Sequence, residues 1–383
     1  MAKKSVTKTE SGTTSSTATS STAAASMQRP PAEVLYAGEL ATLRETDRGP
    51  KPPGWELSLS AVRRFILGDE QLGIRKKFVG HASLVDRAMV TLATQRGLMM
   101  IGEPGTAKSL LSELLAAAVS GRSTLTIQGG ASVTEDQIKY SWNYALLVAE
   151  GPSLRALVPA PIYTGMREGR DVRFEEITRC PLEVQDSLLS MLSDRVLAVP
   201  ELTGEDGMVF AKDGFNVIAT ANTRDRGVNE MSAALKRRFN FETIFPIGDF
   251  ATELALVRAE ATRLLQRSGV PLAPSEDVLE VLVTTFRELR DGEASDGTQL
   301  EKLSSVMSTA ECVAVMHAVG VRGYYERGDA GSPADVVESL AGTAAKDDPE
   351  DLRRIRRYLE QRVKTKDGPH WRELYEARHR LPG

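Results

Sequence analysis

The sequence predicts an α/β domain with a parallel sheet and flanking helices, followed by a smaller all-helical domain. Three observations support this prediction. Short apolar runs typical of buried strands alternate with helical patterns up to about residue 246. A glycine-rich loop joins one of these runs, residues 98–101, to a helical pattern. Beyond Pro246 the strand-like runs stop, and the remaining segments have helical spacing.

We divide the 383 residues into a tail and linker (1–55), an α/β core (56–248), a helical domain (249–365) and a C-terminal extension (366–383). Residues 1–26 hold 19 serine, threonine or alanine residues and almost no large apolar side chains. Such a segment cannot bury enough surface to offset the entropy lost on ordering, so we predict that it is disordered. Two proline pairs bracket one expected helix, at residues 32–46.

The hydrophobic periodicity places the elements of both domains. In the core we expect helices at 82–96 and 109–119, and strands at 98–101, 124–127, 172–174 and 215–219. In the helical domain we expect helices at 252–268, 275–290, 302–319, 333–345 and 349–363. Strands that alternate with helices usually pair in parallel, with helices on both faces of the sheet.

The composition argues against several classes of protein. A formal net charge of −4 gives no general bias toward nucleic acid, so we expect no nucleic-acid partner. The two cysteines, Cys180 and Cys312, cannot form a disulfide framework, which is typical of a reducing compartment. No apolar run is long enough to span a membrane, and no secretory signal is evident. We therefore expect a cytoplasmic protein without membrane insertion.

The residues after the apolar run 98–101 follow a known phosphate-binding spacing. They read Gly102-Glu103-Pro104-Gly105-Thr106-Ala107-Lys108-Ser109 and match G-x-x-x-x-G-K-[ST], with Ala107 in place of the second glycine. In such a loop, backbone N–H groups and the N-terminus of the following helix surround the phosphates of a nucleotide. Lys108 would reach the β- and γ-phosphates, and the Ser109 hydroxyl would ligate Mg²⁺. The loop therefore predicts ATP and Mg²⁺ as ligands.

A phosphate-binding loop of this kind needs neighbouring strands that supply further polar groups. Glu175 and Glu176 follow the expected strand at 172–174. We expect Glu175 to hold the metal and Glu176 to orient and deprotonate the attacking water. Asn222 ends the apolar run that begins at Phe215, where its amide would bond that water or the γ-phosphate. Two surface glutamates and a turn-forming asparagine are the alternative interpretations.

Basic residues follow on a short helical segment, at Lys236, Arg237 and Arg238. An arginine near a nucleotide domain can neutralise the charge that develops during phosphoryl transfer, and a neighbouring subunit often donates it. We take Arg238 as the first candidate for such a finger and Arg237 as the second. The active site would then lie at a subunit interface. A solvated basic patch is the alternative.

These motifs resemble those of the MoxR-type AAA+ ATPases, over about residues 78–340. The phosphate loop of that family commonly reads Gly-x-Pro-Gly-x-Ala-Lys-Ser/Thr, with the same alanine. Its acidic strand, Asp-Glu-Ile-Asn-Arg-x-Pro, is similar to residues 175–181, and its Ala-Thr-x-Asn sensor is similar to residues 219–222. Its Ala-x-x-Asp-Arg-Phe segment resembles residues 234–239, which aligns Arg238 with the finger. Residues 78–81 resemble the Val-Val-Gly-Gln segment beside the adenine, which implies that Val79 and Gly80 bind the nucleotide.

The sequence departs from the family pattern in three places. Glu175 replaces an aspartate, and Thr178 replaces an asparagine. The family usually carries an arginine in a Ser-Pro-Arg or Ser-Thr-Arg segment of the helical lid domain. The corresponding stretch here resembles Ser308-Thr309-Ala310, so that arginine is absent.

Two segments resemble the inserts of this family. In residues 139–161 the aromatic side chains Tyr140, Trp142 and Tyr144 alternate, which predicts a β-hairpin with one packed aromatic face. An exposed aromatic set would instead grip a client protein. The family's hairpin insert faces the central region of a ring. Residues 196–212 resemble the second insert.

The resemblance implies a Mg²⁺-dependent ATPase that acts as a homo-oligomeric ring of six subunits. It also implies a chaperone-like role in remodelling or maturing a partner protein, and partners that carry a von Willebrand factor A domain. Two alternatives stay open. One is a nucleotide-gated scaffold with little or no hydrolysis, and the other is a motor associated with nucleic acid.

Overall fold

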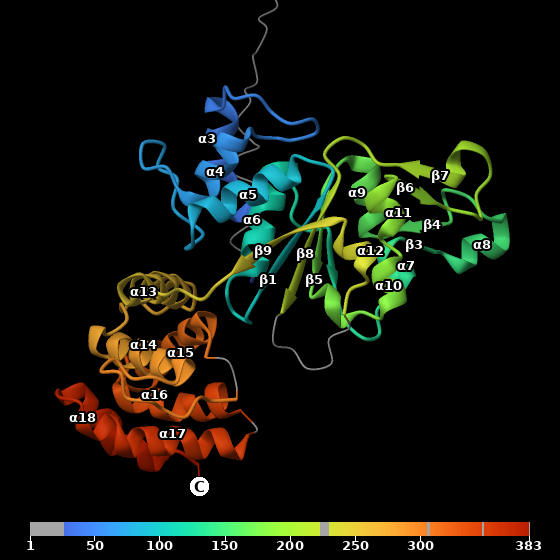
Figure 1. Ribbon diagram of the computed structural model, residues 1–383. Helices are drawn as coiled ribbons and strands as arrows, with labels where there is room; N and C mark the ends of the chain where they lie inside the picture. The colour runs from blue at the N-terminus through green and yellow to red at the C-terminus, as the bar shows by residue number, and fades with distance from the viewer. Residues whose placement is uncertain (1–26, 223–229, 305–306, 347, 383) are drawn as a thin grey trace, which may run out of the picture.

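The computed structural model describes residues 27–222, 230–304, 307–346 and 348–382. The tail that we predict to be disordered, residues 1–26, lies outside the described residues. Figure 1 shows an α/β body with a helical domain beside it, and the connection runs from the last strand of the sheet into α13 (Phe250–Arg267). This arrangement confirms the predicted fold class.

The α/β body is built on five parallel strands in the order β2-β5-β8-β1-β9. They are β1 (Gly97–Gly102), β2 (Thr126–Gln128), β5 (Asp171–Glu175), β8 (Asn216–Asn222) and β9 (Phe239–Ile244). Four of them correspond to predicted strands. The edge strand β9 was not predicted, because its alternating apolar and polar residues leave it half-buried rather than continuously apolar.

Helices cover both faces of this sheet. Leu98 and Met100 of β1 pack with α4 (Leu59–Leu67), α5 (Ala82–Leu92) and α6 (Lys108–Ser120). Met99 points to the opposite face, where buried side chains of α9 (Pro161–Glu168), α10 (Leu182–Asp186) and α11 (Leu189–Ser193) meet it. The alternation along β1 therefore separates two apolar layers, as expected for a strand buried on both sides.

The predicted helix at 32–46 is two helices, α2 (Ala32–Leu35) and α3 (Ala37–Thr46). The break lies at Tyr36, whose backbone is not helical (φ −113°, ψ 25°). The N–H of Ala32 donates to Glu113 Oε1 of α6 at 3.0 Å. The hydroxyl of Ser123 donates to Glu33 Oε2 at 2.6 Å. These contacts hold the segment against the α/β body.

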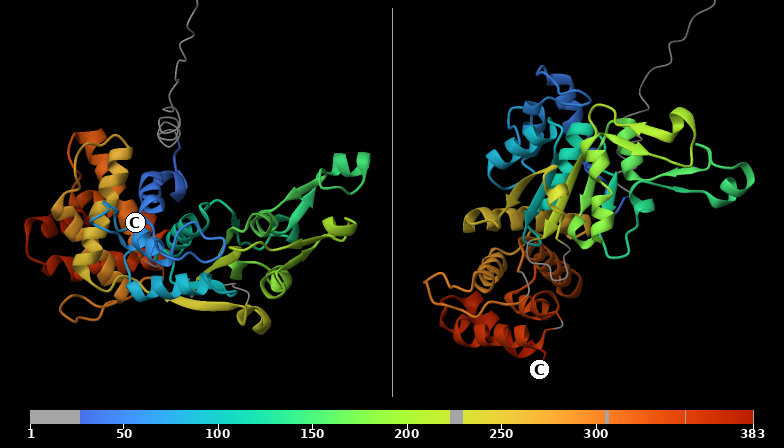
Figure 2. Two further views of the ribbon diagram at one scale, coloured as in Figure 1. Left: turned by 90° about the horizontal axis from the view of Figure 1, so that it is seen from above. Right: turned by 45° about the vertical axis from the view of Figure 1, so that its right-hand side comes forward.

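Two small antiparallel pairs form the inserts. The first is β3 (Tyr140–Trp142) with β4 (Leu157–Pro159), preceded by α7 (Glu135–Ile138), and the second is β6 (Val196–Ala198) with β7 (Met208–Phe210). The predicted hairpin at 139–161 is present, but a helix, α8 (Tyr144–Glu150), separates its arms. Tyr144 therefore lies on α8 rather than in an aromatic row with Tyr140. Figure 2 shows both inserts reaching away from the body, on the side opposite the helical domain.

The two inserts contact each other through Glu201. Its carboxylate accepts hydrogen bonds from the Tyr140 hydroxyl at 3.0 Å and from the Trp142 indole at 3.4 Å. The two rings also pack edge to face, with centroids 6.0 Å apart. Tyr140 and Trp142 thus form the packed face of the first insert.

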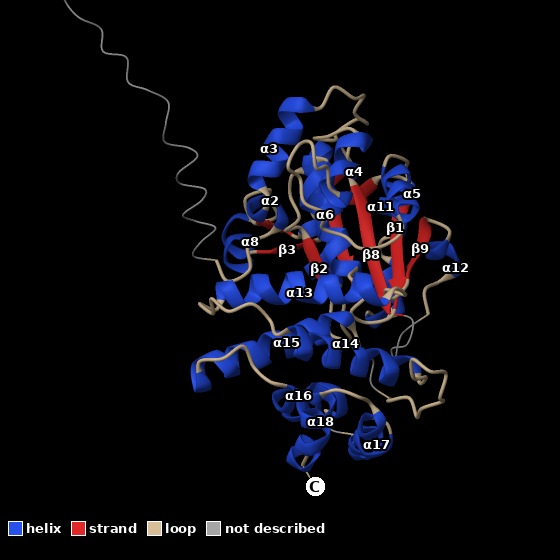
Figure 3. Ribbon diagram, turned by 90° about the vertical axis from the view of Figure 1, so that its left-hand side faces the viewer, coloured by secondary structure: helices blue, strands red, loops and turns tan. Residues whose placement is uncertain are grey.

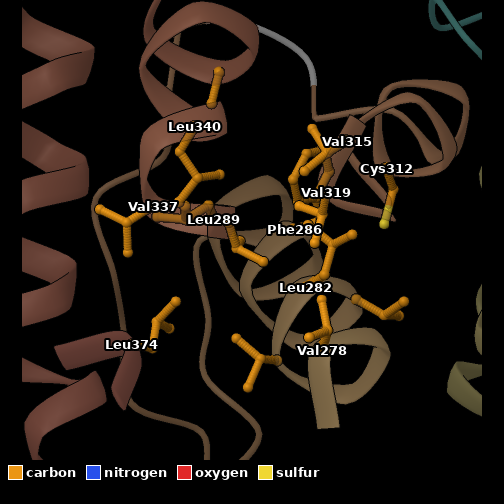
Figure 4. Close-up of a cluster of buried hydrophobic side chains, with 14 of the residues drawn as sticks. Val278, Leu282, Phe286, Leu289, Cys312, Val315, Val319, Val337, Leu340 and Leu374 are labelled. Carbon is orange, nitrogen blue, oxygen red and sulfur yellow. The ribbon is translucent and has the colours of Figure 1, made fainter. Parts of the chain in front are cut away.

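The helical domain, called the lid domain below, contains α13, α14 (Glu276–Asp291), α15 (Thr309–Arg322), α16 (Pro333–Leu340), α17 (Pro349–Gln361) and α18 (Pro369–Glu376). Its buried side chains form one cluster, including Leu282, Phe286 and Val315 (Figure 4). The helix predicted at 302–319 begins later, at Thr309, because Ser308 and Glu311 form a capping box there. In the described parts of the chain, no helix combines the length and apolarity needed to cross a membrane.

The carboxyl ends of the parallel strands face the lid domain, as Figure 3 shows. Ligand sites of parallel α/β sheets lie at this edge. The short helix α12 (Ala233–Lys236) precedes β9 and therefore lies at the opposite, amino-terminal edge.

Candidate nucleotide-binding site

The predicted phosphate-binding loop leaves the carboxyl end of β1 and enters α6 at Lys108. Gly105 has φ +75°, in the left-handed region that glycine adopts without strain. Ala107 has φ +66° and adopts the same region at a cost of about 1–2 kcal/mol. The alanine that replaces the second glycine is therefore compatible with the loop conformation. The loop turns tightly because these two residues share the left-handed conformation.

Lys108 is buried beneath the loop. Its ammonium group donates to the carbonyl oxygens of Gly102 at 3.0 Å and of Glu103 at 2.7 Å. These bonds place a positive charge inside the turn, close to the backbone N–H groups that open α6. A phosphate group in the loop would meet both.

The predicted metal-binding residues, Ser109 and Glu175, lie in direct contact. The Ser109 hydroxyl on α6 donates to Glu175 Oε2 at the end of β5, at 2.7 Å. Both are oxygen donors, and one carries a negative charge, which is the chemistry that Mg²⁺ prefers. Their contact brings the phosphate loop and the acidic strand to one point.

Three further groups bind the Glu175 carboxylate. Ser112 donates to Oε1 at 2.6 Å, Thr220 to Oε2 at 2.8 Å, and the Arg173 guanidinium to Oε1 at 2.8 Å. Burial alone would raise the pKa of Glu175, but Arg173 and the three hydroxyls outweigh it and hold that pKa below its ordinary value. Glu175 is therefore ionised although it is almost fully buried.

Glu176 adopts the left-handed conformation (φ +55°) directly after β5. Its N–H donates to the Thr220 hydroxyl at 3.0 Å, so Thr220 binds both glutamates. Its carboxylate forms an ion pair with Arg179 at 3.0 Å. Asn222 ends β8, where it pairs in register with Gly102, the first residue of the phosphate loop. The sheet thus brings Glu176 and Asn222 to the edge where the loop begins.

A cleft lies between the phosphate loop and the lid domain. Its lining combines loop residues with an apolar wall and with polar lid residues: Val79, Phe245 and Leu256 are in the wall, Glu103 to Ala107 are in the loop, and Ser308 and Thr309 belong to the lid. Gly80 is not among the lining residues, and a Cβ added to it would lie 2.5 Å from the ring of Phe78. The apolar wall beside Val79 suits a nucleotide base.

The lid domain touches the phosphate loop directly. A Cβ added to Gly105 would lie 2.2 Å from the Ser308 Cβ, so only a glycine fits at that position. Ser308 also begins α15 through its capping box. The start of α15 therefore packs on the turn that would hold the phosphates.

Arg237 and Arg238 lie far from the phosphate loop of their own chain. The N–H of Gly97, the first residue of β1, donates to the Arg238 carbonyl at 2.9 Å, whereas the loop follows the last residue of β1. Six strand residues span about 17 Å. The Arg238 side chain donates to Ser193 at 2.8 Å, and the Arg237 side chain is exposed. Neither arginine lines the cleft.

An arginine that the sequence did not single out does line the cleft. Arg290 lies in the last turn of α14, beside Ser308 and Thr309. The family resemblance placed the lid arginine in the stretch 308–310, which begins 18 residues after Arg290. The position of Arg290 in the sequence therefore gave no indication of its role. The basic residue in the last turn of α14 was the available signal, but it is an ordinary feature of helix ends.

Comparisons with known proteins agree with this geometry. Residues 97–239 match the family described as "AAA domain (dynein-related subfamily)", and residues 251–382 match the "YehL-like AAA+ ATPase C-terminal domain". The chain is 64% identical to YehL of Escherichia coli (strain K12) over 357 residues, which is 93% of this chain and 98% of YehL. It is 25% identical over 266 residues to the gas vesicle ATPase GvpN2 of Halobacterium salinarum, covering 66% of this chain and 71% of GvpN2.

Among solved structures, NtrX from Brucella abortus in complex with ADP is 13% identical, with a TM-score of 0.46, over 78% of this chain and 61% of that chain. NtrX in complex with ATP is 14% identical, with a TM-score of 0.45, over 80% of this chain and 68% of that chain. The chain belongs to the AAA+ ATPase family, and it joins an AAA domain of the dynein-related subfamily to a YehL-like C-terminal domain.

Proposed function

We propose that this protein binds ATP together with Mg²⁺, hydrolyses it in an oligomeric ring, and uses the cycle to remodel a partner protein. The observation that carries the proposal is the contact between Ser109 and Glu175. It unites the loop that would hold the phosphates with the strand that supplies the carboxylates, 66 residues further along the chain.

The residues present fit a nucleotide with its metal. The N–H groups of the loop and the ammonium group of Lys108 would hold the β- and γ-phosphates. Ser109 and Glu175 offer oxygen atoms of the kind that Mg²⁺ binds. When bound, the metal supplies positive charge that neutralises the phosphate oxygens.

We assign the proton transfer to Glu176. Its carboxylate would accept a proton from the attacking water, and its ion pair with Arg179 fixes its direction. The amide of Asn222, at the end of the neighbouring strand, would orient the same water. The Thr220 hydroxyl accepts a hydrogen bond from the backbone N–H of Glu176 and donates to the Glu175 carboxylate, so it links the two residues.

We assign Arg238 to the site of a neighbouring subunit, with Arg237 as the second candidate. Because Arg238 lies at the opposite edge of the sheet from its own phosphate loop, it cannot reach the phosphates of its own chain. A head-to-tail ring would bring this edge of one subunit toward the cleft of the next, where the guanidinium stabilises the transition state. Six subunits are the number expected from the resemblance to the MoxR-type group.

The inserts are the surfaces that we assign to the partner protein. Val148 of α8 and Phe210 of β7 are 88% and 68% exposed, and Tyr144 is also exposed. The elements that carry these residues, α8 and β7, belong to the two inserts, which extend away from the lid domain (Figure 2). The resemblance to the MoxR-type group extends the proposal to partners with a von Willebrand factor A domain and to a cytoplasmic location.

A nucleotide-gated scaffold with little hydrolysis is the second candidate. The observation that favours it is the saturation of Glu175, which four side-chain donors already bind. A carboxylate engaged in this way is less available to a metal and its water.

Phosphate release by the purified full-length chain separates the two candidates. We expect turnover by the natural protein, loss of turnover with retained nucleotide binding in Glu176→Gln, and loss of binding in Lys108→Ala. Turnover in Glu176→Gln equal to that of the natural protein would reject the hydrolytic role. Unchanged binding in Lys108→Ala would reject the site itself.

A further inference from the structure

Arg290 reaches the cleft from the lid domain and is held there by a buried carboxylate. Its guanidinium forms a double contact with Glu253 of α13, with Nη1–Oε1 and Nη2–Oε2 distances both 3.0 Å. Nη1 also lies 3.3 Å from the carbonyl oxygen of Met307. The Arg290 side chain is only 9% exposed. A charged group held in this way has a defined direction and few alternative conformations.

Glu253 has more partners than Arg290 alone. Arg287 donates to its Oε2 at 2.9 Å, and the Thr309 hydroxyl donates to its Oε1 at 2.6 Å. The carboxylate of Asp291, at 3.5 Å from Arg290 Nε, is half-exposed. Two arginines thus share one fully buried carboxylate. If Arg290 left Glu253 for another anion, Arg287 would still neutralise Glu253 and the Thr309 hydroxyl would still donate to it, so no buried charge would be left unpaired.

The same cluster is connected to the phosphate loop. Thr309, which binds Glu253, follows Ser308, which packs on Gly105 of the loop. Arg290, Ser308 and Thr309 line the cleft together with the loop residues. The position where the family resemblance places a lid arginine holds Ala310.

We propose that Arg290 is the lid residue that binds the terminal phosphate of ATP, and that it exchanges Glu253 for that phosphate when ATP enters. The proposal rests on the function proposed above, because it requires a triphosphate in the loop. The guanidinium supplies from the end of α14 the positive charge that is absent at the start of α15. A phosphate can accept both arms of the guanidinium, as the Glu253 carboxylate does in this structure. Glu253 then remains with Arg287, and the lid domain closes on ATP more firmly than on ADP.

Arg287 provides a matched control. It lies on the same helix, binds the same carboxylate oxygen as Arg290 does, and does not line the cleft. Loss of either arginine removes one positive partner of Glu253. Only the loss of Arg290 removes a positive charge from the cleft.

The test is equilibrium titration of the full-length chain with a non-hydrolysable ATP analogue and with ADP, in the presence of Mg²⁺. We expect Arg290→Ala to weaken binding of the analogue about tenfold or more, which is the loss typical of one charge-assisted phosphate contact. Its ADP affinity and both affinities of Arg287→Ala should change by less than about threefold. Arg290→Lys keeps the charge without the two-armed geometry and should recover part of the analogue affinity. Glu253→Gln weakens the hold on Arg290 and should tighten binding of the analogue.

Equal losses for the analogue and ADP, or equal losses in Arg290→Ala and Arg287→Ala, would overturn the proposal, because they indicate a structural role in the lid. Thermal melting of each variant identifies a folding defect. If Arg290→Ala has such a defect, the analogue and ADP affinities of Arg290→Lys decide between the outcomes. Lys108→Ala distinguishes failure of the Arg290 proposal from failure of the proposed nucleotide-binding function. If Lys108→Ala abolishes binding while Arg290→Ala changes nothing, only the role of Arg290 is rejected.

Discussion

The close contact between Gly105 and Ser308 allows a quantitative test of the packing of the lid domain on the phosphate loop. In Gly105→Ala, the new Cβ would lie 2.2 Å from the Ser308 Cβ and 2.4 Å from its Oγ. Ordinary contacts between carbon atoms are about 3.5–4 Å, so the two segments must separate by more than about 1 Å. Forced overlaps of this kind cost about 1–3 kcal/mol. The left-handed backbone (φ +75°) adds about 1–2 kcal/mol for an alanine.

Titration with a fluorescent ATP analogue measures the consequence. We expect Gly105→Ala to bind at least about tenfold more weakly, since about 1.4 kcal/mol corresponds to a factor of ten. Ser308→Gly removes the side chain that the new Cβ would meet. The double variant should therefore recover the part of the loss that is due to the overlap and keep the part that is due to the backbone. A double variant that binds no better than Gly105→Ala would show that Ser308 does not pack on the loop in solution, and would refute the reasoning.

Four further predictions concern single side chains. Asp171 is fully buried, and burial raises its pKa well above the ordinary value. The folded state therefore keeps its proton when the unfolded state has lost it, so stability falls as pH rises above about 4. Asp171→Asn should flatten the dependence of stability on pH. At neutral pH it should also raise the free energy of unfolding by more than about 1 kcal/mol, measured by denaturant titration. A pH dependence equal to that of the natural protein would contradict this prediction. Arg173→Met leaves the Glu175 carboxylate buried without the Arg173 guanidinium, and should lower the free energy of unfolding by about 3 kcal/mol. An unchanged unfolding midpoint would show that stability does not depend on this ion pair. Leu282→Ala empties a fully buried site in the lid domain and should cost about 2–5 kcal/mol, read from the same titrations. The Cys312 thiol is buried, and burial raises its pKa. It should therefore not react with iodoacetamide at pH 8 until the lid domain unfolds. Rapid labelling of Cys312 in the folded protein would contradict this prediction.

The core of the fold could be predicted because its strands are buried on both faces. The run at 98–101 is continuously apolar, and those at 172–174 and 215–219 each contain a single polar residue, Arg173 and Asn216. Each of the three corresponds to a strand of the sheet. The edge strand β9 escaped prediction because one side of it is half-exposed, which breaks the apolar run. The helix α8 escaped for a different reason, since Tyr144 to Ala149 are all apolar and show no helical periodicity, although none of them is buried.

The phosphate loop could be located from the sequence because its residues are adjacent in the chain, and spacing alone defines them. Two partners of Glu175 could not. Ser112 and Thr220 meet that carboxylate only because α6 packs on β5 and β8 pairs with β5, and no local pattern marks them. Arg173 is a local partner, since it precedes Glu175 by two residues on the same strand and therefore lies on the same face. Arg290 is the clearest case. It comes from the end of a lid helix, and only the packing of α13, α14 and α15 brings it to the cleft.

The most direct test of the central claim, that one subunit completes the active site of the next, is ATP hydrolysis by mixed rings. Glu176→Gln lacks the proposed base but retains Arg238, and Arg238→Ala has the reverse defect. Each variant alone should hydrolyse ATP far more slowly than the natural protein. Mixed in equal amounts before assembly, they should recover up to about a quarter of the natural rate, since half of the subunits carry Glu176 and half of their neighbours carry Arg238. A mixture no faster than its parents, or an Arg238→Ala protein as fast as the natural one, would contradict the claim.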